Sequence, residues 1–153
     1  MSLSFVRSRT SRTRLVRPLV AIALALALAS CGDDTILGIA NSWTLQTVEG
    51  AAPPFTVPNT EHDVIITSGT ASISSGGHYT FTFMGTIDGD PATVGMDQGS
   101  WTIASSTFNF RSSTLNGKTF VAAYSTSTFN VAVPGEVVGS TTNAINMVFA
   151  KVP

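Results

Sequence analysis

The sequence predicts an all-β domain, a small antiparallel up-and-down β-barrel of about eight strands, preceded by a signal peptide. Three observations support this prediction. Apolar and polar residues alternate with period two in successive short segments, turn residues separate the segments, and the first thirty residues have the composition of a secretory leader. No window beyond the leader carries an apolar stripe of helical period with caps, so we expect no long helix.

The leader combines a basic start with an apolar stretch. Five arginines lie between residues 7 and 17 with no acidic residue among them, and Leu19 to Ala29 form an apolar run of eleven residues. A helix that spans a bilayer needs about 20 such residues, so a cleaved signal peptide is favoured over a permanent transmembrane anchor.

The segment Leu28-Ala29-Ser30-Cys31 resembles the lipobox of bacterial lipoproteins, in which small residues precede a cysteine that receives diacylglycerol before cleavage. Cys31 is the only cysteine of the chain. The resemblance implies that residues 1–30 are a lipoprotein signal peptide and that lipid on Cys31 anchors the mature protein to a membrane, stably once two or more acyl chains are attached. Gly32 after the cysteine implies, by similarity to enterobacterial sorting, a place in the cell envelope on the outer membrane, facing the periplasm.

The chain after the leader has the size of one domain and an acidic composition. Removing 30 of the 153 residues leaves 123, and we expect residues 31–40 to form a lipidated tether and residues 41–153 the β-barrel domain. This part contains nine acidic residues and only Arg111, Lys118 and Lys151 as cations, a net charge of −6 with histidine neutral. Nucleic acid is therefore not expected as a partner, because its binding depends on many cationic contacts to phosphate.

The expected strands are marked by apolar residues that face one side. The clearest runs from Tyr79 to Ile87, where apolar residues alternate with threonine and methionine. The other expected inward-facing sets are, in chain order, Trp43 and Leu45; Val64 and Ile66, or the opposite face through Ile65; Trp101 and Ile103; Phe108 and Phe110; Phe120 and Tyr124; Phe129, Val131 and Val133; and Ile145, Met147 and Phe149.

Turn residues separate these runs at Ser75-Gly76-Gly77, Asp88-Gly89-Asp90-Pro91, Asn116-Gly117 and Pro134-Gly135. Asn116-Gly117, between two apolar runs, predicts a hairpin with a type I′ turn. Antiparallel strands without covering helices avoid free edges by closing into a barrel. A two-sheet sandwich is the alternative, because the periodicity of its strands is the same.

From Ser42 the chain reads S-W-T-L-Q-T-V-E-G-A-A-P-P-F. This resembles the start of lipocalin-like lipoproteins of Gram-negative bacteria, G-x-W-x-L-x-x-V-x-G followed by prolines, although Asn41 replaces the first glycine. The turn at Gly76-Gly77 and the G-S-W-T-I segment from Gly99 are similar too. The resemblance implies a lipocalin-like barrel in which Trp43 closes one end of the core. It also implies that the loop of residues 49–59, whose prolines disfavour a ladder strand, forms a lid over the open end.

Residues suited to catalysis or zinc binding are few. Glu61-His62-Asp63, with His78 on a later turn, is the densest set of potential zinc ligands, but neighbours on an extended chain point in different directions, which favours a solvated strand entry. There is no G-x-S-x-G nucleophile motif, and neither histidine has a recognisable catalytic partner. We therefore predict no catalytic residue, metal or cofactor, and do not expect an enzyme.

A second potential metal site lies in an acidic segment that is expected to be one loop. Asp88, Asp90 and Asp97 begin like a calcium-binding loop. Ala92 and Gly99 occupy later positions where such a loop needs oxygen ligands, so at most weak divalent binding is expected.

The aromatic residues leave two functions open. An eight-stranded barrel is just wide enough either to be filled by side chains or to hold one small ligand. In the first case the protein is a structural or protein-interaction lipoprotein of the envelope with a solid core, and in the second it binds a small hydrophobic ligand. The cavity of the second case would be lined by Trp43, Phe81, Phe83, Trp101, Phe108, Phe110, Phe120 and Tyr124.

Overall fold

The computed structural model describes residues 38–59, 61–104 and 107–153. Cys31, the expected signal peptide and most of the expected tether lie outside these residues. Within the described part of the chain, no helix has both the length and the apolar character needed to cross a membrane.

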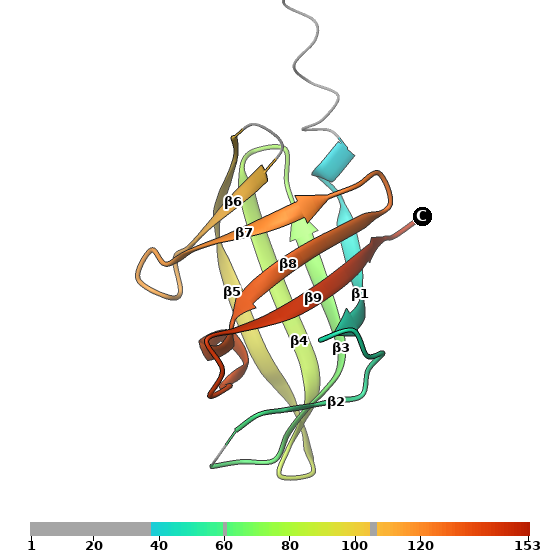
Figure 1. Cartoon of the computed structure of the whole chain (residues 1–153), viewed down its shortest axis with the longest axis vertical. Coiled ribbons are helices and arrows are strands. Elements are labelled where there is room, and N and C mark those ends of the chain that lie inside the picture. The colour runs from blue at the N-terminus through green and yellow to red at the C-terminus, as the bar shows by residue number, and fades with distance from the viewer. Residues whose placement is uncertain (1–37, 60, 105–106) are drawn as a thin grey trace, which may run out of the picture. The chain divides into compact units, whose positions relative to one another are not determined.

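Eight antiparallel strands close into a barrel, as the sequence predicts (Figure 1). From β3 to β9 each strand pairs with the next along the chain, and β1 completes the ring by pairing with both β9 and β3. Trp43 of β1 lies opposite Lys151 on one side and opposite Ala71 on the other. The ring consists of β1 (Ser42–Val48), β3 (Val64–Ile73), β4 (His78–Ile87), β5 (Asp90–Ala104), β6 (Thr107–Ser112), β7 (Thr119–Tyr124), β8 (Thr128–Pro134) and β9 (Ala144–Lys151). Closure excludes the sandwich alternative.

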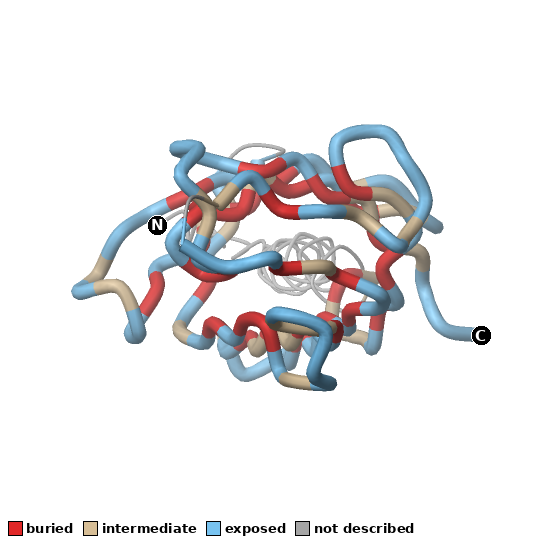
Figure 2. Tube along the Cα trace, turned by 90° about the horizontal axis from the view of Figure 1, so that it is seen from below, coloured by how far each residue is buried: buried red, intermediate tan, exposed pale blue. Residues whose placement is uncertain are grey.

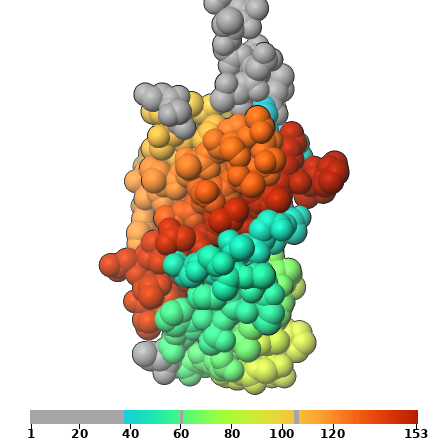
Figure 3. Space-filling model, turned by 45° about the vertical axis from the view of Figure 1, so that its right-hand side comes forward, coloured from blue at the N-terminus to red at the C-terminus, as the bar shows by residue number. Residues whose placement is uncertain are grey.

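A short strand, β2 (Phe55–Val57), pairs with residues 64–66 of β3 at the end of the sheet order. The prediction that residues 49–59 contain no ladder strand is therefore wrong for these three residues. Pro54 and Pro58 flank the strand instead of interrupting it, so each strand residue keeps its N–H. In the space-filling view the segment lies across the surface beside β3, and no deep hollow opens there (Figure 3).

Tight turns join several strands. Asn116 and Gly117 have positive φ angles of 51° and 80°, which confirms the left-handed backbone that a type I′ hairpin turn requires. Asp88 and Gly89, between β4 and β5, have φ angles of 54° and 91°. This conformation matches the right-handed twist of the flanking strands, so β4 and β5 pair from the turn onward.

Strand β5 is longer than the sequence predicts. Residues 90–99, expected to be an acidic loop, continue the ladder with β4. The alternation is hidden because Gly95, Asp97 and Gly99 occupy inward positions where apolar side chains are expected. A bulge opposite Phe83 and Met84 also shifts the phase of the pattern along this pair of strands.

The core fills the barrel, and buried and exposed residues alternate along the strands (Figure 2). At one end Trp43 is fully buried, and its Nε1 donates a hydrogen bond of 3.1 Å to the carbonyl oxygen of Ile39, which is also fully buried. At the other end lies the 3-10 helix η1 (Gly135–Val138), with Val138 1% exposed. The packed domain thus includes Ile39, inside the segment expected to be a tether.

Candidate functional site

Aromatic residues proposed as a cavity lining meet one another, and also Phe129 and Phe149, inside the barrel. The ring of Phe81 on β4 lies at the centre. Its centroid is 5.7 Å from that of Phe110 on β6, 6.1 Å from that of Phe129 on β8 and 5.8 Å from that of Phe149 on β9. Centroid separations of roughly 4.5 to 7 Å mean direct contact between rings. Rings from four strands therefore meet within this layer of the barrel.

A second aromatic row lies at the end that Trp43 closes. Trp43 contacts Tyr124 at 5.8 Å between ring centroids, Tyr124 contacts Phe108 at 5.6 Å, and Phe108 contacts Trp101 at 5.7 Å. The indole Nε1 of Trp101 donates a hydrogen bond to the carbonyl oxygen of Ser74 in the β3–β4 turn. This row connects β1, β7, β6 and β5, so the rings fill the space between these strands.

Asp97 is a fully buried carboxylate that the sequence placed in a loop. Its Oδ2 accepts a hydrogen bond of 2.6 Å from the Tyr79 hydroxyl, and its Oδ1 accepts one from the Ser112 hydroxyl. Ser112 Oγ in turn accepts a hydrogen bond of 2.8 Å from the backbone N–H of Leu115. The signal that identifies Asp97 as an inward residue is its period-two phase with Trp101 on the same strand.

This network joins three strands and the β6–β7 hairpin. Burial, followed by the hydrogen bond to Asp97 and its negative charge, raises the pKa of Tyr79 far above its ordinary value. A buried carboxylate is costly unless it is hydrogen-bonded, and here two hydroxyl groups supply the bonds. Since both carboxylate oxygens are engaged, the network positions the backbone around it and does not offer a free acid or base.

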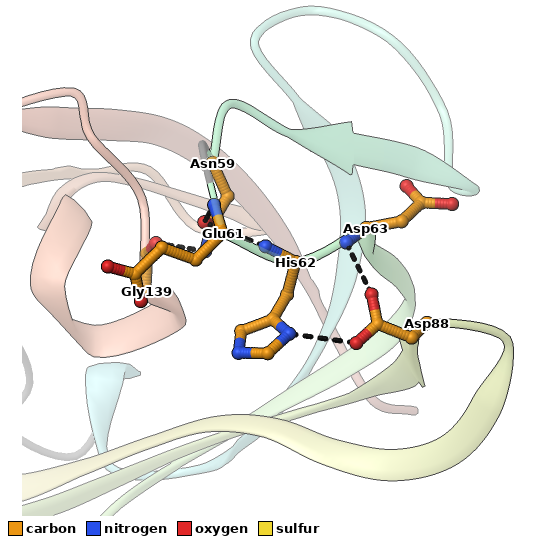
Figure 4. Close-up of polar contacts among 6 residues, drawn as sticks. All are labelled: Asn59, Glu61, His62, Asp63, Asp88 and Gly139. Carbon is orange, nitrogen blue, oxygen red and sulfur yellow. Dashed lines mark hydrogen bonds and ion pairs between the residues drawn. The ribbon is translucent and has the colours of Figure 1, made fainter.

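Asp88 holds His62 and Asp63 at the end of the barrel opposite to Trp43. Figure 4 shows these contacts. Nδ1 of His62 lies 2.8 Å from Oδ2 of Asp88, and Oδ1 of Asp88 accepts a hydrogen bond of 2.9 Å from the backbone N–H of Asp63. The Asp63 hydrogen bond, followed by that of His62, lowers the pKa of Asp88 below its ordinary value. The carboxylates of Glu61 and Asp63 point away from this pair (Figure 4).

The structure does not assemble the potential zinc ligands. His78 begins the ten-residue strand β4 and Asp88 follows its last residue, so about 30 Å of extended chain separates them. In the described ranges, no three His, Cys, Asp or Glu side chains are placed to hold one metal ion. The calcium-like pattern is also not assembled, because Asp88 lies on a turn and Asp97 lies inside the barrel.

Hydrogen bonds between distant loops hold the Asp88 end together. Nδ2 of Asn59 donates a 2.6 Å hydrogen bond to the carbonyl oxygen of Gly139, and Oδ1 of Asn59 accepts one from the backbone N–H of Glu61 (Figure 4). The backbone N–H of Thr141 donates to the carbonyl oxygen of Pro58 at 2.9 Å. The loop expected to be a lid is thus attached at its far end to the loop after η1.

A groove of about 860 Å³ lies on the outer surface of β4, β5 and β6. It was not identified from the sequence, because the polar residues that form it are typical of any solvated strand face. The side chains that line it are mostly polar or basic, and those on the outer face include His78, Thr80, Gln98, Ser100, Arg111, Ser113 and Asn116. Its position places it directly outside the backbone that the Tyr79–Asp97–Ser112 network supports.

Comparisons of this chain with protein-family models, with curated proteins and with solved structures gave no match. The fold is a small closed antiparallel barrel. This architecture is the one that the resemblance to lipocalin-like lipoproteins implies.

Proposed function

We propose that this protein is a lipid-anchored lipoprotein of the cell envelope, without enzymatic activity, whose solid barrel is a scaffold that presents its outer face and loops to a partner. The anchoring part of the proposal is supported by the basic and apolar leader and by the lipobox-like segment that ends at Cys31. Gly32, directly after the cysteine, supports a location on the outer membrane, facing the periplasm.

The observation that supports a scaffold over a carrier of small hydrophobic ligands is the packing of the interior. Phe81 contacts rings from three other strands across the barrel. Buried apolar residues occupy both ends of the barrel, where a ligand would enter. Trp43 and Ile39 lie at one end, and η1 lies at the other. A ligand in the interior would have to displace these side chains from close contacts, which a preformed site does not require.

The polar groups inside the barrel also fit a structural role. The buried hydroxyls of Tyr79 and Ser112 are both bonded to Asp97. A catalytic group must instead reach a substrate atom within hydrogen-bond distance. The His62–Asp88 pair is exposed to solvent at a strand entry, and among the described residues no third His, Cys, Asp or Glu side chain joins it in a cluster that could hold a metal ion.

A fluorescence titration tests the choice between scaffold and carrier. We expect long-chain fatty acids to leave the emission of Trp43 and Trp101 in the full-length protein unchanged at micromolar concentrations, because the rings already fill the interior. Phe81→Ala is the positive control: it leaves an apolar space the size of one ring, so benzene should change the tryptophan emission of this variant and not that of the wild type. A saturable response of the wild type to fatty acids would overturn the solid scaffold in favour of the carrier.

Mass spectrometry tests the anchor separately. Protein extracted from the producing membrane should begin at Cys31 and carry the mass of its acyl chains, whereas Cys31→Ala should carry none because the chain has no other thiol. An unmodified Cys31 in the wild type would contradict the lipid anchor. It would not affect the choice between scaffold and carrier, which the titration tests.

A further inference from the structure

The outer groove is built on a row of side chains that crosses three strands. His78 lies opposite Ser100 in the β4–β5 ladder, and Ser100 lies opposite Arg111 in the β5–β6 ladder. Opposite residues of antiparallel strands place their Cβ atoms about 5 Å apart on the same face of the sheet. An imidazole, a hydroxyl and a guanidinium therefore stand next to one another along one side of the groove.

Arg111 forms no ion pair within the part of the chain that the structure describes. The ion pairs there involve the carboxylates of Asp88 and Glu136, both with other partners. Asp97 belongs to the neighbouring strand, but it faces the interior and gives both oxygens to hydroxyl groups. In a mature chain with nine acidic residues and three cations, Arg111 is thus an exposed positive charge that is open to an external anion.

The β6–β7 hairpin limits the freedom of this arginine. A Cβ atom at Gly117 would lie 3.3 Å from both Nε and Nη2 of Arg111, so the turn backbone lies close beside the guanidinium. Gly117 has a φ of 80°, and the hydrogen bond from the Leu115 N–H to buried Ser112 fixes the start of the same turn. A guanidinium that is already confined loses less conformational entropy when it binds an anion.

The rest of the groove offers hydrogen bonds and no aromatic surface. Thr80 and Gln98 lie opposite each other in the row next to that of Arg111, and the Ser113 hydroxyl bonds to the carbonyl oxygen of Gln98. The ring of Tyr79 lies inside the barrel, so among the described lining residues the imidazole of His78 is the one ring that faces the groove. Hydroxyl and amide groups beside one cation match a ligand that is rich in hydroxyls and carries a negative charge.

We propose that this groove binds an acidic sugar, with the carboxylate or phosphate of the ligand on Arg111 and its hydroxyl groups along Thr80 and Gln98. Arg111 forms two parallel hydrogen bonds to such a group, and His78 adds a third donor from across Ser100. The proposal does not depend on the lipid anchor, because the groove lies entirely on the described barrel.

Isothermal titration of the full-length protein in detergent micelles tests the proposal with three probes. Trigalacturonate supplies carboxylates, glucose 6-phosphate supplies a phosphate, and maltotriose is the neutral control. We expect at least one anionic probe to bind and maltotriose to bind far more weakly. Arg111→Gln should weaken the affinity for the anionic probe about 10- to 100-fold. This is the range for loss of a hydrogen bond to a charged group.

Two further variants separate a local site from general charge. Lys151→Gln removes the same charge from β9, away from the groove, and should leave the affinity unchanged. Ser100→Asp keeps Arg111 but places a carboxylate beside it, and should abolish binding of the anion. An equal loss in Lys151→Gln, equal binding of maltotriose, or no binding of either anionic probe at millimolar concentration would overturn the proposal.

Discussion

The hydroxyl of Tyr79 and the carboxylate of Asp97 satisfy each other inside the barrel, through a hydrogen bond of 2.6 Å between residues that are 2% and 0% exposed. Both side chains are shielded from bulk solvent. Removing one partner therefore leaves the other unsatisfied, and substituting both should lower the free energy of unfolding by less than the sum of the two single substitutions.

A double-mutant cycle measures this dependence. Asp97→Ala leaves the hydroxyls of Tyr79 and Ser112 without their acceptor, and each unsatisfied group costs about 1 to 3 kcal/mol. Tyr79→Phe leaves the carboxylate with one donor fewer and should cost about 1.5 to 3 kcal/mol. We expect the double variant to be less destabilised than the sum, by a coupling energy of about 0.5 to 3 kcal/mol in urea unfolding. Simple additivity would show that the two groups do not depend on each other.

Two neighbouring serines give a matched comparison. Ser112→Ala removes a buried hydroxyl that bonds to Asp97 and anchors the Leu115 N–H, whereas Ser113→Ala removes an exposed hydroxyl that bonds to the Gln98 carbonyl oxygen. We expect Ser112→Ala to lower the free energy of unfolding by about 1 to 3 kcal/mol and Ser113→Ala by less than about 0.5 kcal/mol. Similar unfolding midpoints for the two variants would contradict the account of the network.

The raised pKa of Tyr79 has an alkaline signature. The unfolded chain releases the phenolic proton near pH 10, whereas the folded chain holds it, so the contribution to stability is intact below about pH 10 and falls as the pH rises further. In folded protein, absorbance titrations of the wild type and Tyr79→Phe should coincide up to about pH 11. In concentrated urea the wild type should gain one additional phenolate. A difference between the folded curves near pH 10 would show that Tyr79 is accessible.

Trp43 and His62 differ in burial and should differ in energetic weight. Trp43 is fully buried, and its truncation to alanine should cost about 3 to 5 kcal/mol. His62, with 54% of its side chain exposed, pairs with Asp88, and His62→Ala should cost less than about 1 kcal/mol. Urea unfolding followed by circular dichroism measures both values. Comparable losses would mean that the end of the barrel near Trp43 is not closed as described.

The lowered pKa of Asp88 has an acid signature. The carboxylate accepts the Asp63 N–H, so this link is complete above the ordinary carboxyl pKa and is lost as the pH falls through the lower value in the folded protein. In amide NMR spectra the Asp63 signal should shift at a pH below about 3.9, and this transition should be absent in Asp88→Asn. A transition that persists in the variant would assign it to another group.

Period-two alternation was sufficient to predict the strands that carry large apolar residues. Phe129, Val131 and Val133 are buried on β8 as expected, and the same holds for Ile145, Met147 and Phe149 on β9. Where an inward face carries small or polar residues, the pattern has no signal. Residues 90–99 of β5 are not predicted as a strand for this reason, because Gly95, Asp97 and Gly99 replace the expected apolar side chains.

The site residues are harder to predict than the strands, because their contacts depend on the register between neighbouring strands. That Asp97 meets Tyr79 follows from the pairing of β4 with β5, which one strand's sequence does not specify. The same is true of His62, whose partner Asp88 lies on a turn twenty-six residues away. The aromatic set was identified correctly as inward-facing, but only the ring contacts show how closely its members pack.

The pairing of β1 with β9 has a consequence for how the chain folds. Leu45 lies opposite Phe149, and the Val152 N–H donates a hydrogen bond to the Ser42 carbonyl oxygen. These contacts close a loop of about a hundred residues, which is entropically far costlier than the tight hairpins between the other strands. Such nonlocal pairing raises the contact order and slows folding into the range of milliseconds to seconds. Until β9 has been synthesised, β1 has only its short pairing with β3, and one edge of β8 stays open to other chains.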